Sequence, residues 1–164
     1  MSRRFHPRHA LLTGASGAIG GALARVLHAR HPELHLSLVD KDGRGLLQLA
    51  TALGGRTSTY SWDLALPSTM AHLWERVVSE SGEVDLLVNC AGFMEIRSFA
   101  KTDWELGERL LHVDLLTPLR LMNLAVTRMP ERGGSIVNIS SMAGRVPLRG
   151  CSYYGAAKAG LEMA

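Results

Sequence analysis

Three residues near the end of the chain have the types and spacing of a proton-transfer site. Tyr154 and Lys158 are four positions apart, so a helix would place both side chains on one face. An ammonium close to a phenol favours the phenolate form and prepares the tyrosine to exchange a proton near neutral pH. Ser141 stands 13 residues before Tyr154, just after an apolar run, where its hydroxyl could hydrogen-bond a reacting oxygen.

Each of these features also has a plainer explanation. Tyr and Lys fall four apart by chance in many helices, and two adjacent serines at 140 and 141 are typical of a loop that caps or turns. Lysine usage favours a special role for Lys158, because only three of the 18 basic residues are lysines, at 41, 101 and 158. An ammonium is compact and rotates among several partners, which a planar guanidinium does not.

A second group of residues, near the start, has the glycine spacing of a nucleotide-binding turn. Residues 13–20 read Thr-Gly-Ala-Ser-Gly-Ala-Ile-Gly. Such glycines let the chain turn sharply and let a pyrophosphate approach the backbone, at the start of a helix whose free N–H groups face the phosphates. An ordinary strand-to-helix turn built from small residues is the alternative explanation.

Asp40 follows Gly20 by 20 residues, at the end of the second apolar run. A carboxylate in this place accepts hydrogen bonds from both ribose hydroxyls of an adenosine, although a solvated aspartate at a strand end is the alternative. Together with the glycine turn, Asp40 favours NAD over NADP, because a carboxylate repels a 2′-phosphate. Lys41, the next residue, leaves NADP open.

The elements that must position these residues alternate between short apolar runs and segments of helical period. This is the pattern of a parallel sheet covered by helices on both faces. Strands are predicted over residues 10–13, 36–39, 58–62, 84–88 and 136–139, and helices over 18–29, 45–53, 67–78, 102–129 and 154–164. The long helix is predicted to open with a capping box at 102–105 and to be interrupted at Pro118. The fold class is therefore α/β, a Rossmann-type doubly wound parallel sheet, with residues 1–164 as a single nucleotide-binding domain.

Taken together, these motifs resemble the short-chain dehydrogenase/reductase family. Residues 13–20 match the family's glycine motif, residues 89–92 (Asn-Cys-Ala-Gly) match its Asn-Asn-Ala-Gly segment, and Ser141, Tyr154 and Lys158 match its Ser and Tyr-x-x-x-Lys constellation. The resemblance spans residues 10–164 and implies an NAD(P)-dependent oxidoreductase that interconverts a small-molecule alcohol and a carbonyl. It also implies a homo-oligomer. The cofactor contacts that it implies are Gly14, Ser16, Gly17, Ile19, Gly20, Asp40, Asp63, Leu64, Asn89, Ala91, Gly92, Tyr154 and Lys158.

Two positions depart from the family pattern. Cys90 replaces the usual second Asn after the fourth strand, and Asp114 replaces the family's catalytic Asn on the long helix. In the family, the backbone carbonyl of that Asn holds a water next to the lysine. Pro118 has no N–H to donate to the Asp114 carbonyl, so the resemblance assigns Asp114, with Ser141, Tyr154 and Lys158, to the catalytic group as the anchor of the relay water.

Family members continue past the Tyr-x-x-x-Lys helix with a sixth strand and a substrate lid. We therefore expect a sheet whose C-terminal strands are missing and whose fifth strand is exposed at an edge. Two alternatives to a working enzyme stay open. One is a truncated, non-catalytic nucleotide-binding or regulatory module, and the other is a partial gene product of such an enzyme.

Composition argues against several other classes. Hydrophobic residues make up 46% of the chain, but no stretch approaches the roughly 20 apolar residues of a membrane span. The net charge of +3 comes from scattered basic residues, and only 5% of residues are aromatic, so no nucleic-acid partner is predicted. Cys90 and Cys151 are far apart and form no CxxC pair, which predicts no metal site and two free thiols in a reducing cytoplasm. The Arg3-Arg4 pair resembles a twin-arginine export signal, but we reject that interpretation because residues 6–9 interrupt the approach to the apolar segment.

Overall fold

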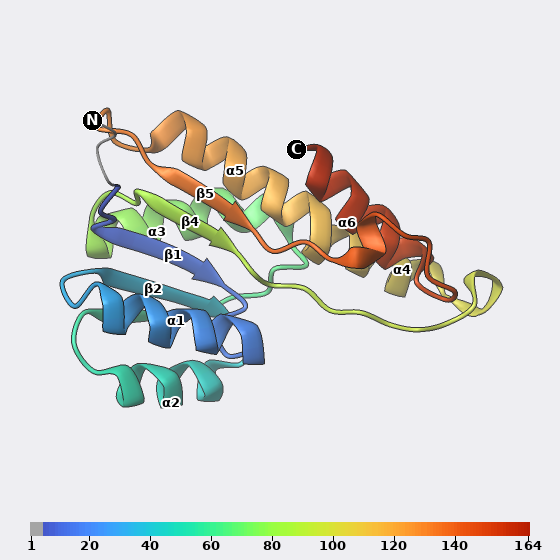
Figure 1. Ribbon diagram of the computed structural model, residues 1–164, viewed down its shortest axis with the longest axis horizontal. Helices are drawn as coiled ribbons and strands as arrows, with labels where there is room; N and C mark the ends of the chain where they lie inside the picture. The colour runs from blue at the N-terminus through green and yellow to red at the C-terminus, as the bar shows by residue number, and fades with distance from the viewer. Residues whose placement is uncertain (1–4) are drawn as a thin grey trace.

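Five parallel strands form one sheet in the order β3-β2-β1-β4-β5 in the computed structural model, which describes residues 5–164 (Figure 1). The Arg3-Arg4 pair lies outside these residues. The strands are β1 (His9–Thr13), β2 (His35–Asp40), β3 (Thr57–Ser61), β4 (Leu86–Asn89) and β5 (Ser135–Asn138). Every strand predicted from the apolar runs is present, and the predicted fold class is confirmed.

The helical elements lie between the strands and after β5. They are α1 (Ala18–Arg30), α2 (Gly43–Leu53), η1 (Pro67–Thr69), α3 (Met70–Ser81), η2 (Phe99–Lys101), α4 (Trp104–Leu111), η3 (His112–Leu116), α5 (Thr117–Arg128), η4 (Met142–Gly144) and α6 (Ser152–Met163). Helices α1 and α2 cover one face of the sheet, and α3 and α5 cover the other (Figure 1).

The hydrophobic core has two halves, one on each face of the sheet, because side chains alternate in direction along each strand. Successive side chains of a strand point to opposite faces. Leu12 of β1 therefore packs with the cluster under α1 and α2, while its neighbour Leu11 packs with Trp74 of α3 and Leu121 of α5. All five residues of β1 are buried, as expected for a central strand of a parallel sheet.

The parallel register brings the carboxyl ends of the central strands to one edge of the sheet. Thr13, the last residue of β1, pairs with Val39 of β2, and Leu12 pairs with Val88 of β4. The loops that follow β1, β2 and β4 therefore start side by side. Such an edge is where open parallel sheets bind ligands.

The predicted capping box at residues 102–105 is wrong. Helix α4 begins at Trp104, and its N-cap residue Asp103 makes no capping hydrogen bond with its side chain. The Thr102 hydroxyl donates instead to the Ser98 carbonyl, 3.1 Å away, because the short turn η2 brings that carbonyl within reach. The chain thus uses Thr102 to close the preceding turn.

The long helix is interrupted before Pro118 and not at it. Element η3 is a π-helical turn, in which the Thr117 N–H donates to the His112 carbonyl five residues earlier. Pro118 lies in the first turn of α5, which continues directly from η3, so its missing N–H leaves a carbonyl of the preceding turn without that donor. The π-helical turn carries Asp114, and π-bulges are frequent at functional sites.

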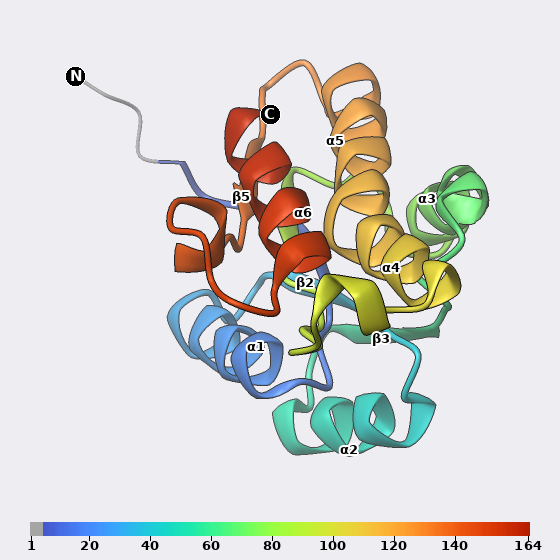
Figure 2. The same cartoon turned by 90° about the vertical axis from the view of Figure 1, so that its right-hand side faces the viewer.

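Helix α6 packs against α4, η3 and η4 (Figure 2). Glycine permits two of these close approaches. A Cβ on Gly144 of η4 would lie 2.8 Å from the Lys158 carbonyl carbon, and a Cβ on Gly160 of α6 would lie 3.1 Å from the Leu115 side chain. The packing fixes α6, and with it Tyr154 and Lys158, next to the π-helical turn.

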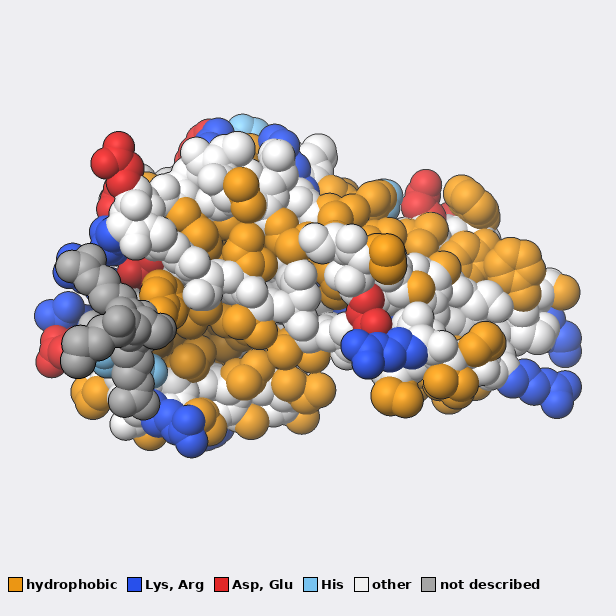
Figure 3. Space-filling model, turned by 45° about the horizontal axis from the view of Figure 1, so that its top comes forward, with side chains coloured by type: hydrophobic (Ala, Val, Ile, Leu, Met, Phe, Trp, Pro, Cys, Tyr) orange, Lys and Arg blue, Asp and Glu red, His pale blue; other side chains and the backbone are white. Residues whose placement is uncertain are grey.

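Strand β5 forms one edge of the sheet, as expected, and β3 forms the other. Hydrophobic side chains are exposed on the surface that Figure 3 presents. Val137 in the middle of β5 is 42% exposed. Among residues 5–164, no helix is both long enough and apolar enough to cross a membrane.

Candidate active site

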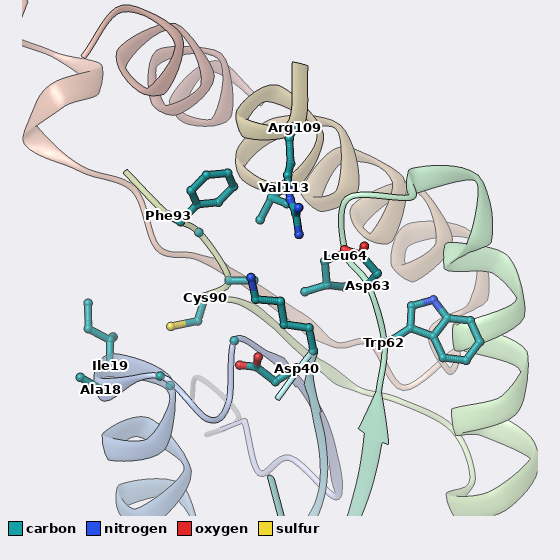
Figure 4. Close-up of a pocket in the computed structure, with 16 residues that line it drawn as sticks. Ala18, Ile19, Asp40, Trp62, Asp63, Leu64, Cys90, Phe93, Arg109 and Val113 are labelled. Carbon is teal, nitrogen blue, oxygen red and sulfur yellow. The ribbon is translucent and has the colours of Figure 1, made fainter. Parts of the chain in front are cut away.

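A cavity of about 340 Å³ lies at the carboxyl edge of the sheet (Figure 4). Its walls come from the turn after β1, the ends of β2 and β3, the loop after β4, and the face of α4 and η3. The lining residues are Gly14, Gly17, Ala18, Ile19, Gly20, Asp40, Lys41, Trp62, Asp63, Leu64, Cys90, Ala91, Gly92, Phe93, Arg109 and Val113.

The glycine turn approaches its neighbours so closely that it has no room for side chains. Gly14 has a φ of +68°, and a Cβ there would lie 2.7 Å from the Ala91 Cα. A Cβ on Gly20 would overlap the Gly14 carbonyl oxygen. Gly17 is the N-cap of α1 and offers no side-chain acceptor, which leaves the first N–H groups of this helix to a ligand. The turn thus has the open backbone that phosphate binding needs.

Thr13 joins the glycine turn to the loop after β4. Its hydroxyl oxygen accepts hydrogen bonds from the N–H groups of Cys90 and Ala91, each 3.1 Å away. This contact explains why Ala91 lies so close to Gly14. Parts of both matched segments, Gly14 and residues 17–20 of the first and residues 90–92 of the second, therefore lie side by side in the cavity wall.

Asp40 points into the cavity from the end of β2 (Figure 4). Its Oδ2 accepts from the Ser16 N–H at 3.1 Å and its Oδ1 from the Asp42 N–H at 3.2 Å. These bonds orient the carboxylate and still leave lone pairs for a ligand. On the adjacent wall Asp63 accepts from the Ala65 N–H at 2.9 Å, and Leu64 beside it is buried.

Four of the predicted cofactor contacts lie outside this lining, namely Ser16, Asn89, Tyr154 and Lys158. Ser16 stands behind the glycine turn and meets Asp40 through its N–H. Asn89 is buried, and its amide nitrogen donates to the Asn138 oxygen of β5 at 2.9 Å. Among the described residues the Asn89 oxygen has no donor. Asn89 thus pairs β4 with β5 at the register position where the two residues face each other.

Three lining residues were not predicted from the sequence. Trp62 follows β3, and its indole N–H donates to the Thr69 hydroxyl at 2.9 Å. Arg109 and Val113 reach the cavity from α4 and η3, and Arg109 points toward it from the side opposite Asp40 (Figure 4). The spacing of four between Arg109 and Val113 is the signal that could have identified this wall, because it places both on one helix face.

The residues predicted to transfer a proton lie around η3, η4 and α6. The Lys158 ammonium lies 5.7 Å from the centre of the Tyr154 ring, as the spacing of four predicted. Ser141 is the N-cap of η4, and its oxygen accepts from the Ala143 N–H at 3.2 Å. No hydrogen bond joins Ser141 to Tyr154 within residues 5–164. The capping explanation for Ser141 therefore describes its present contact.

Asp114 and Lys158 meet directly. Lys158 Nζ lies 3.2 Å from Asp114 Oδ1, and the two side chains are 5% and 0% exposed. Asp114 Oδ2 accepts from the Phe93 N–H at 3.2 Å, and Lys158 also donates to the Ile139 carbonyl at 3.1 Å. Burial raises the pKa of the Asp114 carboxyl, and the neighbouring ammonium acts in the opposite direction. A Cβ on Gly92 would overlap Asp114 Oδ1, so this pair needs glycine there.

Both cysteines are free thiols. Cys90 lines the cavity, where burial raises the pKa of its thiol, and Cys151 is buried. The described part of the chain contains no group of three His, Cys, Asp or Glu side chains placed to hold a metal ion.

Comparison with known proteins gives a consistent result. The family model described as short chain dehydrogenase matches residues 8–164. Nodulation protein G of Rhizobium meliloti is 39% identical over 160 residues, which cover 94% of this chain and 62% of that protein. The chain thus spans about three fifths of the length of this curated relative.

Solved structures agree with the sequence relatives. A short-chain dehydrogenase from Streptomyces avermitilis superposes with a TM-score of 0.87 and 30% identity, over 98% of this chain and 58% of that one. A metagenomic short-chain oxidoreductase, solved in complex with NADP, superposes with a TM-score of 0.85 and 28% identity, over 95% of this chain and 72% of that one.

Proposed function

The chain belongs to the short chain dehydrogenase family, and on that premise we propose that it forms the nucleotide-binding part of an NAD(P)-dependent oxidoreductase. The reaction is the interconversion of a small-molecule alcohol and a carbonyl. The observation that carries the proposal is the convergence of the glycine turn, Asp40 and the loop after β4 on one cavity. Oligomeric assembly and a cytoplasmic location belong to the same proposal, the second supported by the two free thiols.

The residues that line the cavity fit a dinucleotide in three respects. Gly14 and Gly20 let the turn pack closely against Ala91 and against the start of α1, which gives it the compact shape of a phosphate-binding turn. The N-terminus of α1 faces the same space without a side-chain cap. Asp40 and Asp63 then supply acceptors for an adenosine, and Leu64 supplies an apolar contact.

We propose NAD as the preferred nucleotide. The Asp40 carboxylate would accept hydrogen bonds from the adenosine ribose and would repel a 2′-phosphate. Lys41 and Arg109 line the same cavity and act in the opposite direction. The carboxylate is held in place by two backbone N–H groups, whereas Lys41 and Arg109 are exposed and their charges are screened. NADH is therefore expected to bind more tightly than NADPH by on the order of 1 to 3 kcal/mol.

Titration of the chain with each nucleotide tests this preference. Trp62 lines the cavity, so energy transfer from tryptophan to the reduced nicotinamide reports binding. Asp40→Asn is expected to remove most of the difference between NADH and NADPH. Asp42→Asn is the matched control, because Asp42 caps α2 through the Gly45 N–H and does not line the cavity. Equal or tighter NADPH binding by the unmodified chain would contradict the assignment.

The reaction assigns a distinct task to each of the chain's own residues. A bound nicotinamide supplies the hydride acceptor or donor. The Tyr154 phenol would give a proton to the carbonyl oxygen, or take one from the alcohol. The Ser141 oxygen accepts from Ala143, so its O–H proton stays available to donate to the substrate oxygen. Lys158 would hold the nicotinamide ribose and favour the phenolate form of Tyr154.

Nucleotide binding without turnover is a second candidate function. The cavity lining favours it, because it includes the adenosine side and omits Ser141 and Tyr154. Assays of NAD reduction with a panel of secondary alcohols separate the two candidates. Binding with no reduction by any alcohol supports the second.

A further inference from the structure

A buried ion pair joins α6 to the π-helical turn η3. Lys158 Nζ lies 3.2 Å from Asp114 Oδ1, with neither side chain more than 5% exposed. The second carboxylate oxygen accepts from the Phe93 N–H after β4, and the ammonium donates to the Ile139 carbonyl after β5. Four separate segments of the chain therefore meet at two opposite charges.

Stability alone does not account for this pair. A buried ion pair returns in attraction about what its members lose in hydration, and a neutral replacement of both is often equally stable. The raised pKa of the Asp114 carboxyl shows that its loss of hydration outweighs the attraction of Lys158. A pair that gains little for the fold, yet requires glycine at position 92 to make room for it, serves another purpose.

Lys158 and Asp114 attract each other as opposite charges at short range. Lys158 Nζ lies 3.2 Å from Asp114 Oδ1, and within residues 5–164 this oxygen has no other donor. An ammonium has three N–H groups, of which one goes to the Ile139 carbonyl. The carboxylate thus holds the position and charge of Lys158 and leaves its other donors for the site.

We propose that Asp114 is a positioning residue whose side-chain carboxylate holds the Lys158 ammonium in place by direct charge contact. This differs from the role implied by the family resemblance, in which the backbone carbonyl of residue 114 anchors a water. The importance of the contact for ribose binding rests on the proposed function, but the contact itself does not depend on a nucleotide.

Acylation of lysines without any nucleotide tests the proposal. The chain has only three lysines, and Lys41 and Lys101 are exposed, so peptide mass spectrometry can follow each amine separately. Lys158 is expected to react slowly in the unmodified chain. In Asp114→Asn it is expected to react at least about tenfold faster relative to Lys41, because an ammonium without its anion gives up its proton more easily.

The matched control is Asp85→Asn. It removes another buried carboxylate, 1% exposed, which directly precedes β4 at the amino ends of the strands. It is expected to leave the Lys158 rate unchanged. Asp114→Glu keeps the carboxylate and is expected to preserve the slow rate. Equal Lys158 rates in the unmodified chain and Asp114→Asn, or equal rates in Asp114→Glu and Asp114→Asn, would overturn the proposal.

Cys151 reports whether the local fold survives these changes. It is 4% exposed and directly precedes α6. Increased alkylation of Cys151 in Asp114→Asn would mean that Asp114 maintains the fold of this segment and does not specifically hold the Lys158 ammonium. That result would equally contradict the proposal. A failure to bind NADH would argue against the proposed function and would leave the acylation result standing.

Discussion

Removing one member of the Asp114–Lys158 pair is expected to destabilise the chain far more than removing both. In Lys158→Met the buried Asp114 carboxylate loses its cation, which favours the uptake of a proton. For an ordinary aspartate this costs about 4 kcal/mol at pH 7, at 1.36 kcal/mol for each pKa unit. In Asp114→Asn the buried Lys158 ammonium is left without its anion instead, which has a cost of the same order.

These figures are upper limits, since partial hydration offers a charged alternative, and single losses of about 3 to 5 kcal/mol are typical for buried pairs. The double variant Asp114→Asn/Lys158→Met keeps nearly the same shape and leaves no charge uncompensated. We expect its free energy of unfolding to lie within about 1 kcal/mol of the original value. The coupling between the two sites should then be at least about 3 kcal/mol.

Urea unfolding at pH 7, followed by far-ultraviolet circular dichroism, measures all four proteins. Domains are typically stable by about 5 to 15 kcal/mol, so the single variants should still show a folded baseline. A second double-mutant cycle, between Asp85 and Lys158, is expected to show no coupling, because these residues lie at opposite ends of the strands. If the coupling between positions 114 and 158 is below about 0.5 kcal/mol, the two charges act independently and the argument fails.

Acid is expected to weaken the fold through His9, which is 3% exposed and whose pKa burial lowers to about 4. This value lies below the pKa of 6.5 of an unfolded histidine, so the free energy of unfolding is expected to fall by up to about 3 kcal/mol as the pH falls from 6.5 to 4. Urea unfolding of His9→Gln should show a smaller loss over the same pH range. Gly14→Ala is expected to abolish NADH binding, because the added Cβ would lie 2.7 Å from the Ala91 Cα at a φ of +68°. Gly54→Ala, at a φ of +65° with no atom within 4 Å of the added Cβ, is the control in the same titration. In a form of the protein that turns over alcohols, Tyr154→Phe is expected to lose turnover and keep its NADH affinity, and steady-state rates that stay unchanged would assign the proton transfer to another residue.

The parts of the fold that were predicted depend on local physics. Continuous apolar runs with helical segments between them require a covered parallel sheet, and all five strands are present. The glycine turn was predictable because Gly14 needs a positive φ and Gly20 a close approach, and both requirements exclude other residues. Asp40 was predictable because β2 lies beside β1, so the carboxyl end of β2 lies next to the glycine turn.

The parts that were missed depend on contacts between distant segments. The pairing of Asp114 with Lys158 requires the π-helical turn, the absence of a side chain at Gly92 and the packing of α6, none of which is visible in the spacing of either residue. Arg109 lines the cavity through the packing of α4 beside it, which the sequence alone does not show. The capping box was wrong because helix α4 begins one residue later, with Asp103 as its N-cap, and Thr102 instead donates to the Ser98 carbonyl of the preceding turn.

The loop after β4 connects the two halves of the site. On one side the Thr13 hydroxyl holds the N–H groups of Cys90 and Ala91, and on the other the Asp114 carboxylate holds the N–H of Phe93. Gly92 lies between these anchors. The same four-residue loop therefore sets the distance from the glycine turn to the ion pair. A change that moves this loop is expected to affect the glycine turn and the ion pair together, because Thr13 and Asp114 lose their hydrogen bonds to the loop unless they move with it.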